Sequence, residues 1–171
     1  MPAQTRAKSA IPRKFNTSID LAPDTRERMI GLLNQQLADT FDLMSQTKEA
    51  HWNVKGPQFF QLHELYDEVA ETVLPFVDEI AERATALGGL ALGTARMAAE
   101  ATSLDEYPLD AVDGPETIEA VADRLAAYAA AVREAIDTSD ELGDQATADL
   151  FTEVSRAIDK HLWFVEAHVQ R

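Results

Sequence analysis

The 171-residue chain contains no cysteine. Without thiols it forms neither disulfides nor a thiolate metal site, and the usual cysteine-rich structural zinc site is excluded. Long apolar runs are missing as well. The opening MPAQTRAKSAIPRK has no apolar leader core, and no later run approaches the ~20 residues of a membrane span. We therefore expect a soluble, cytoplasmic protein with no membrane partner, and the absence of cysteine is compatible with a reducing compartment.

Basic residues are outnumbered, with 15 against 30 acids. The first 14 residues hold four bases and no acid, so the other 157 residues hold 11 bases against 30 acids, a net charge of −19. Residues 1–18 also lack an amphipathic period, which predicts a flexible basic tail. A tail of this kind either contacts DNA phosphates or only aids solubility. The candidate DNA-contacting residues are Arg6, Lys8, Arg13 and Lys14.

Residues 19–171 read as one all-helical domain, since 46% apolar content in a chain of this length supports one sizeable core. Apolar residues recur at helical spacing over about 23–53, 57–87, 116–141 and 145–169. Between residues 88 and 115 the chain holds four glycines and two prolines, which predict a long crossover with a short helix around 95–101. Such a crossover lets the second and third long helices run parallel in a four-helix bundle.

Two pairs of candidate metal ligands lie on the helix expected over 57–87. His63 and Asp67 are four residues apart, as are Asp78 and Glu82, so each pair shares a helix face. At ~100° per residue all four side chains fall on one stripe. The eleven residues from Asp67 to Asp78, however, span about 16 Å along the axis, whereas metal bonds are about 2.0–2.6 Å long. One ion therefore cannot contact both pairs.

A second copy of the same helix, running antiparallel about a two-fold axis near residues 72 and 73, resolves this difficulty. The His63 pair of one chain then faces the Asp78 pair of the other, which gives two equivalent sites per dimer. His51 is a further nitrogen ligand candidate. Imidazole and carboxylate ligands suit iron, manganese or zinc, and an open coordination position favours redox-active iron.

A common motif of bundle metalloproteins is missing. Intrachain di-iron sites use Glu-x-x-His on two helices, but the residues three before the four histidines are Lys48, Phe60, Ile158 and Val165. This opposes a bundle oxidoreductase with an internal di-metal centre. His161 and His168 share a face without ligand-spaced carboxylates, so we interpret them as packing or surface residues. Pro75 lies between the two ligand pairs and is expected to bend the helix; the spacing argument fails if the helix ends there.

Several motifs together resemble the Dps family of miniature ferritins, over most of residues 20–170. They are Lys48-Glu-Ala-His-Trp-Asn53, His63-Glu-x-x-Asp67, Asp78-x-x-x-Glu82-Arg83, Leu87-Gly-Gly89, Ala91-Leu-Gly-Thr94, Tyr107-Pro-Leu-Asp110 and Asp159-Lys-x-Leu-Trp163.

The resemblance implies a ferritin-like four-helix bundle that assembles from two-fold dimers into a homododecamer. It further implies a ferroxidase that oxidises Fe(II), typically with hydrogen peroxide or otherwise with dioxygen, and stores Fe(III) mineral in the shell, which protects DNA. Zinc or manganese are other possible occupants of the same site. The implied catalytic and metal ligands are His51, His63 and Asp67 from one chain and Asp78 and Glu82 from its mate.

The same resemblance assigns supporting roles. Lys48 is expected to form an ion pair between subunits near the site. Trp52 either packs in a core or interface, or donates electrons beside the metal. Glu141, Asp144 and Asp149 surround the junction of the last two helices and either form an ordinary acidic helix end or line an ion-entry pore. Gln145 stands where related sequences often have a third acid.

A competing hypothesis is a nucleoid-associated protein whose essential act is DNA condensation through its basic tail, with metal only stabilising its interface. Many tails on one oligomer multiply a weak affinity for DNA. Deleting residues 1–14 while following iron oxidation and DNA retardation separates the two hypotheses.

Overall fold

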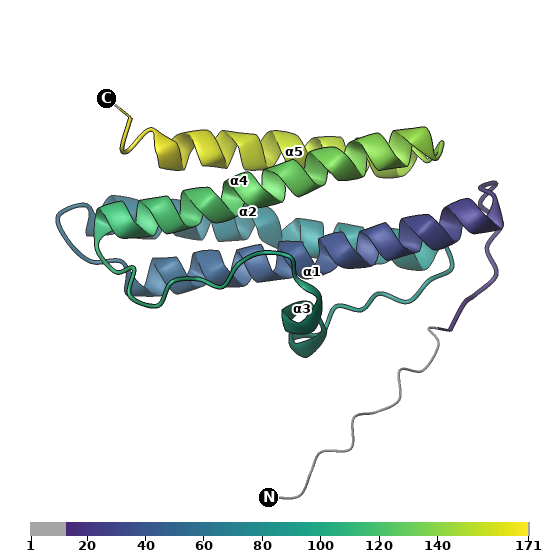
Figure 1. The fold of residues 1–171 in the computed structure, drawn as a ribbon, viewed down its shortest axis with the longest axis horizontal. Coiled ribbons are helices and arrows are strands. Elements are labelled where there is room, and N and C mark those ends of the chain that lie inside the picture. Colours follow the sequence, from purple (N-terminus) through teal and green to yellow (C-terminus); the bar gives the residue numbers. More distant parts are fainter. Residues whose placement is uncertain (1–12, 171) are drawn as a thin grey trace, which may run out of the picture.

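The computed structural model describes residues 13–170. Its helices are α1 (Pro23–Asn53), α2 (Phe59–Ala86), α3 (Ala95–Ala101), α4 (Gly114–Glu141) and α5 (Gln145–Glu166). The long helices lie side by side in a bundle, and the short α3 lies outside it against α1 (Figure 1). The helices α2 and α4 run in the same direction, because the crossover returns along the bundle before α4 begins. The all-α bundle and its crossover helix are thereby confirmed.

The core runs along the inner faces of the four long helices, where apolar side chains repeat at helical spacing. Two buried tyrosines also tie helices together: the Tyr66 hydroxyl lies 3.0 Å from the Thr117 hydroxyl, and the Tyr128 hydroxyl lies 2.5 Å from that of Thr40. Burial raises the pKa of both phenols well above its usual range. These tyrosines are therefore neutral and serve packing.

The crossover is held against α1 by buried polar side chains. Asp39 has no exposed surface and accepts hydrogen bonds from the Ser103 backbone N–H at 2.6 Å and from its hydroxyl at 3.1 Å. Nearer the start of the crossover, Asn34 donates to the Leu90 carbonyl at 3.0 Å and accepts from the Leu92 N–H at 2.7 Å. The crossover and α3 are therefore fixed along one flank of α1.

The helix α2 is continuous through Pro75, so the helix does not end between the two candidate ligand pairs. Pro75 is exposed, and its missing N–H leaves only one bond of the helix unmade. Other boundaries shift slightly. The helix α4 begins at Gly114, where the Glu116 carboxylate accepts from the Asp113 N–H at 3.4 Å. The helix α5 ends at Glu166, three residues before the expected end.

Residues 13–19 form a strap across one end of the bundle. The Phe15 N–H donates to the Gly88 carbonyl at 2.8 Å, and Lys14 forms an ion pair with Glu27 at 2.8 Å. Arg13 lies with its guanidinium carbon 5.1 Å from the centre of the Phe15 ring. The part of the expected tail from residue 13 onward therefore contacts α1 and the end of α2. Arg6 and Lys8 lie outside the described residues.

Within residues 13–170, none of the helices has the length and apolar content that crossing a membrane requires.

Candidate metal centre

His51 and His63 face each other across the α1–α2 hairpin. Their rings stack with centroids 3.7 Å apart and planes inclined by 19°. His51 Nδ1 lies 2.7 Å from the His63 carbonyl oxygen, and His63 Nδ1 lies 2.9 Å from that of His51. A carbonyl only accepts, so both Nδ1 atoms carry the proton and donate. In the neutral ring this tautomer leaves the lone pair on Nε2, which is the atom that would bind metal.

The hairpin also brings Asp67 near the histidines, one turn after His63 on α2. The Lys48 ammonium, one turn before His51 on α1, forms an ion pair with the Asp67 carboxylate. That hydrogen bond and the charge of Lys48, with smaller contributions from the two histidines, hold the pKa of Asp67 below its usual range against a desolvation effect that raises it. Asp67 is therefore ionised, and its charge is paired with that of Lys48.

Lys48 reaches Asp67 of its own chain. The ion pair between subunits that the resemblance implied stays a prediction, because a single chain does not test it. The antiparallel hairpin explains the pair of Lys48 with Asp67. Lys48 lies one turn before His51 on α1, and Asp67 lies one turn after His63 on α2, so the two side chains lie opposite each other. Lys48 therefore occupies the carboxylate that would bind metal.

Asp78 and Glu82 lie on the same continuous helix as Asp67, on its C-terminal half, and both are exposed. Eleven residues of unbroken helix separate Asp67 from Asp78 by about 16 Å. Within residues 13–170 of one chain, no group of three or more His, Asp or Glu side chains converges to hold a metal ion. The described residues of a single protomer therefore separate the two candidate ligand pairs and form no complete site.

The stripe of α2 that carries these ligands also carries exposed apolar residues. Phe60 is 68% exposed and Leu74 is 55% exposed. Seven residues separate Phe60 from Asp67 and Asp67 from Leu74, so all three share a helix face. Sequence analysis did not identify these two residues as part of the site. Their seven-residue spacing from Asp67 was the signal that could have found them.

Trp52 adjoins His51 on the last turn of α1 and is 61% exposed. Its ring borders a recess of about 370 Å³ between α1 and the crossover, together with Tyr107 and Leu109. Phe59 stacks on His63, with ring centroids 5.1 Å apart. An aromatic ring thus packs against the histidine pair, whereas Trp52 faces the recess beside the crossover.

The three residues expected at an ion-entry pore have different surroundings. Glu141 and Asp149 are exposed at the α4–α5 junction. Asp144 is only 2% exposed and forms an ion pair with Arg83 at 2.6 Å. It also caps α5 by accepting from the Thr147 N–H at 3.1 Å. Glu141 and Asp149 are therefore open to solvent, whereas the Asp144 carboxylate is bound within its own protomer. The pairing of Asp144 with Arg83 was not predicted from the sequence.

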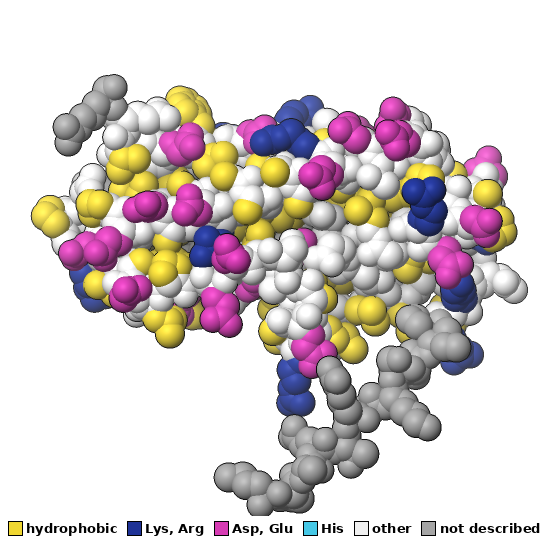
Figure 2. All heavy atoms as spheres, viewed as in Figure 1, with side chains coloured by type: hydrophobic (Ala, Val, Ile, Leu, Met, Phe, Trp, Pro, Cys, Tyr) yellow, Lys and Arg dark blue, Asp and Glu magenta, His cyan; other side chains and the backbone are white. Residues whose placement is uncertain are grey.

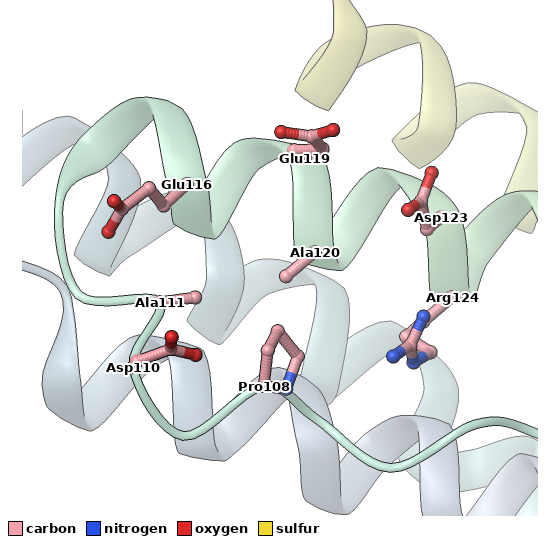
Figure 3. A pocket seen from close by; sticks show the side chains of 8 residues that line it. All are labelled: Pro108, Asp110, Ala111, Glu116, Glu119, Ala120, Asp123 and Arg124. Atoms are coloured by element: carbon pink, nitrogen blue, oxygen red, sulfur yellow. The ribbon is translucent and has the colours of Figure 1, made fainter.

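An acidic recess of about 260 Å³ lies away from the histidines, between the crossover and the start of α4 (Figure 3). Arg124 closes one end by donating to the backbone carbonyls of Asp105 at 2.8 Å and Glu106 at 2.6 Å. Figure 2 shows acidic side chains spread over the same face, with few basic ones between them. The recess is one part of a generally acidic surface. Its acids are Asp110, Glu116, Glu119 and Asp123.

Comparisons with known proteins agree with this architecture. A family model described as a ferritin-like domain matches residues 30–171. The DNA protection during starvation protein of Agrobacterium fabrum is 46% identical over 158 residues, which cover 92% of this chain and 98% of that protein. Two solved structures from Streptomyces coelicolor are also similar. DpsC has a TM-score of 0.87 at 32% identity and covers 93% of each chain. DpsA14 has a TM-score of 0.89 at 30% identity, over 95% of this chain and 96% of its own. From its residues, its fold and these relatives, the chain belongs to the Dps family of ferritin-like proteins.

Proposed function

We propose that the protein oxidises ferrous iron at sites shared between two copies of the chain and stores the ferric product inside a dodecameric shell, in the cytoplasm. The family supports a general role in iron storage and DNA protection. One observation carries the finer proposal. The histidines and Asp67 lie together at one end of α2, and Asp78 and Glu82 lie on its C-terminal half. We take these two groups as the halves of one ligand set.

The ligand positions are consistent with two-fold symmetry. The midpoint of His63 and Glu82 lies between residues 72 and 73, and the midpoint of Asp67 and Asp78 is the same. An antiparallel copy of α2 about that point therefore pairs both sets at once. Leu74, exposed and close to the axis, would be covered by the same contact. A dimer thus completes two sites and buries the apolar stripe.

The chemistry follows from the donors. Neutral Nε2 atoms hold the ferrous ion, and the hard carboxylates favour the ferric product. Iron is the substrate here. With hydrogen peroxide, two ferrous ions each give one electron, the O–O bond breaks, and two hydroxide ions form. Dioxygen is the other candidate oxidant, and zinc or manganese would compete for the same donors. Consuming iron and peroxide together removes the precursors of hydroxyl radical, which is a route to DNA protection.

Complementation between two inactive variants tests the shared site. His51→Ala disables one half-site and Asp78→Ala disables the other, so each homodimer has no complete site. In a mixed dimer, one of the two sites contains both substitutions and the other contains neither. When equal amounts of the two variants reassemble at random, about half of the dimers are mixed. One of the two sites in each mixed dimer is intact, so about a quarter of the original sites should return. The measurement is peroxide-driven iron oxidation by the assembled shells.

His168→Ala serves as a control, because this exposed histidine follows α5 and its side chain bonds only to the Phe164 carbonyl at 2.8 Å among the described residues. It should oxidise iron at the full rate. If the two single variants keep normal oxidation, the ligand assignment is wrong. If both are inactive and the mixture stays inactive in shells of normal size, the site is not shared between chains.

A further inference from the structure

The C-terminal end of α2, which carries Glu82, is tied to α5 by Arg83. The Arg83 Nε donates to the Thr147 hydroxyl at 2.9 Å, and a terminal nitrogen donates to Asp144 Oδ1 at 2.6 Å. The Arg83 side chain is 19% exposed and that of Asp144 is 2% exposed. Charge-assisted bonds of this kind are short and directional. The guanidinium is therefore held in one orientation.

The other end of this contact is equally fixed. Asp144 caps α5 by accepting from the Thr147 N–H at 3.1 Å, and its second oxygen accepts from the Thr147 hydroxyl at 2.5 Å. Arg83 thus hydrogen-bonds both Asp144 and Thr147, the two residues that form the N-terminal cap of α5. The ends of α2 and α5 meet at the same end of the bundle (Figure 1).

Glu82 lies one turn before the end of α2 at Ala86. Ile80, Ala84 and Leu87 are buried in the core and pack this end of α2 against the bundle. Among the described residues, Arg83 is also the one α2 residue after Thr72 whose side chain hydrogen-bonds another helix. The Arg83 contact therefore adds a directional hold on the last turns of α2.

We infer that Arg83 and Asp144 are positioning residues that set the place of Glu82 in the shared iron site. This inference rests on the proposed function, in which Glu82 binds the ion facing the histidines of a second copy. Metal ligands must be held within about 0.5 Å of their productive geometry. The ion pair supplies that hold from the α4–α5 junction. Asp144 therefore acts on iron through the position of Glu82, without contacting the ion.

The test uses anaerobic binding of Co²⁺ to assembled shells, followed by its visible absorption. Asp144→Asn keeps an oxygen that caps α5 but removes the charge that holds Arg83. Arg83→Gln removes the same ion pair from the other side. Each variant should weaken Co²⁺ binding by ~10-fold or more, as loss of a residue that orients a ligand does. Arg83→Lys keeps the charge and should recover part of the affinity. In iron oxidation, the KM for Fe²⁺ should rise more than kcat falls.

A matched control is Arg133→Gln, which breaks an exposed ion pair between α4 and α5, Arg133 with Asp159 at 2.8 Å. Its Co²⁺ affinity should be unchanged. If Asp144→Asn fails to assemble, Arg83→Lys and Arg83→Gln decide. Normal Co²⁺ affinity in assembled Arg83 or Asp144 variants, with weakened binding in Glu82→Gln, overturns this inference and leaves the proposed function intact. Normal binding in Glu82→Gln overturns the proposed function itself.

Discussion

At the scale of single residues, the histidines show how surroundings assign a role. His51 and His63 each donate one ring N–H to a backbone carbonyl and keep the other nitrogen free. His161 is 2% exposed, with Nε2 at 3.0 Å from the Thr72 hydroxyl and with no hydrogen-bond partner for Nδ1 among the described residues. Burial lowers its pKa, Glu68 on α2 opposes the shift, and Lys160 on α5 adds to it. His161 therefore joins α2 to α5 as a neutral side chain.

His161 makes stability depend on pH in a definite direction. Its pKa in the folded chain lies below the ordinary value of about 6.5, so the unfolded chain takes up the proton first as pH falls. The contribution is fully present above about pH 6.5 and is lost as pH falls toward the folded pKa. We expect His161→Gln, which does not titrate, to flatten this part of the profile. Denaturant midpoints measured between about pH 8 and pH 5 provide the check.

His168→Gln is the control for this experiment, because the exposed His168 side chain has an open path to solvent. Its profile should follow that of the unaltered protein. A His161→Gln profile as steep as that of the unaltered protein would show that other groups cause the acid sensitivity.

At the scale of elements, the strap of residues 13–19 depends on a glycine. Gly88 has φ of +92°, and a Cβ at this position would overlap the Phe15 carbonyl oxygen. The carbonyl of the same glycine accepts the Phe15 N–H at 2.8 Å. The end of α2 is therefore held on one side by the strap and on another by Arg83. Both contacts join α2 to a distant part of the chain.

Gly88→Ala should release the strap and destabilise the fold. The positive φ alone costs ~1–2 kcal/mol for a residue with a Cβ. Overlap with the strap adds a further ~1–3 kcal/mol unless the strap moves away. Gly56→Ala isolates the first cost, since Gly56 has φ of +104° and a Cβ added there would meet no atom within 4 Å among the described residues.

Unfolding free energies and tryptic cleavage after Arg13 and Lys14 are the measurements. We expect Gly88→Ala alone to speed cleavage there. Equal stabilities and equal cleavage rates for the two variants would show that the strap contributes nothing at this contact.

At the scale of the whole molecule, charge separates the chain into an acidic domain and a basic beginning. The domain surface repels nucleic acid, so DNA contact depends on the first residues. Of the four basic residues there, Lys14 is engaged by Glu27 and Arg13 stacks on Phe15. DNA binding through this segment is therefore expected to rely strongly on Arg6 and Lys8, and on the number of copies in the assembly.

Deleting residues 1–12 tests this, because the deletion keeps the strap and its contact with Gly88. We expect DNA retardation at low salt to be lost and iron oxidation to be unchanged, since the ligands lie on α1 and α2. Raising the salt concentration should abolish retardation by the full chain as counterions compete. Retardation by the shortened chain would place DNA contact elsewhere, and failure of the full chain to bind at low salt would remove DNA binding as a function.

The sequence by itself determined the helices and the crossover and identified the two candidate ligand pairs, because 3.6-residue periodicity and four-residue spacing are local properties. It also showed, through helix rise alone, that Asp67 and Asp78 cannot share an ion within one chain. Other features were decided only by the tertiary structure. Lys48 meets Asp67 of its own chain, each His Nδ1 bonds the other histidine's carbonyl, and Asp144 turns inward to Arg83. Each of these joins residues on different helices, and sequence spacing fixes positions along one helix but not the contacts between two.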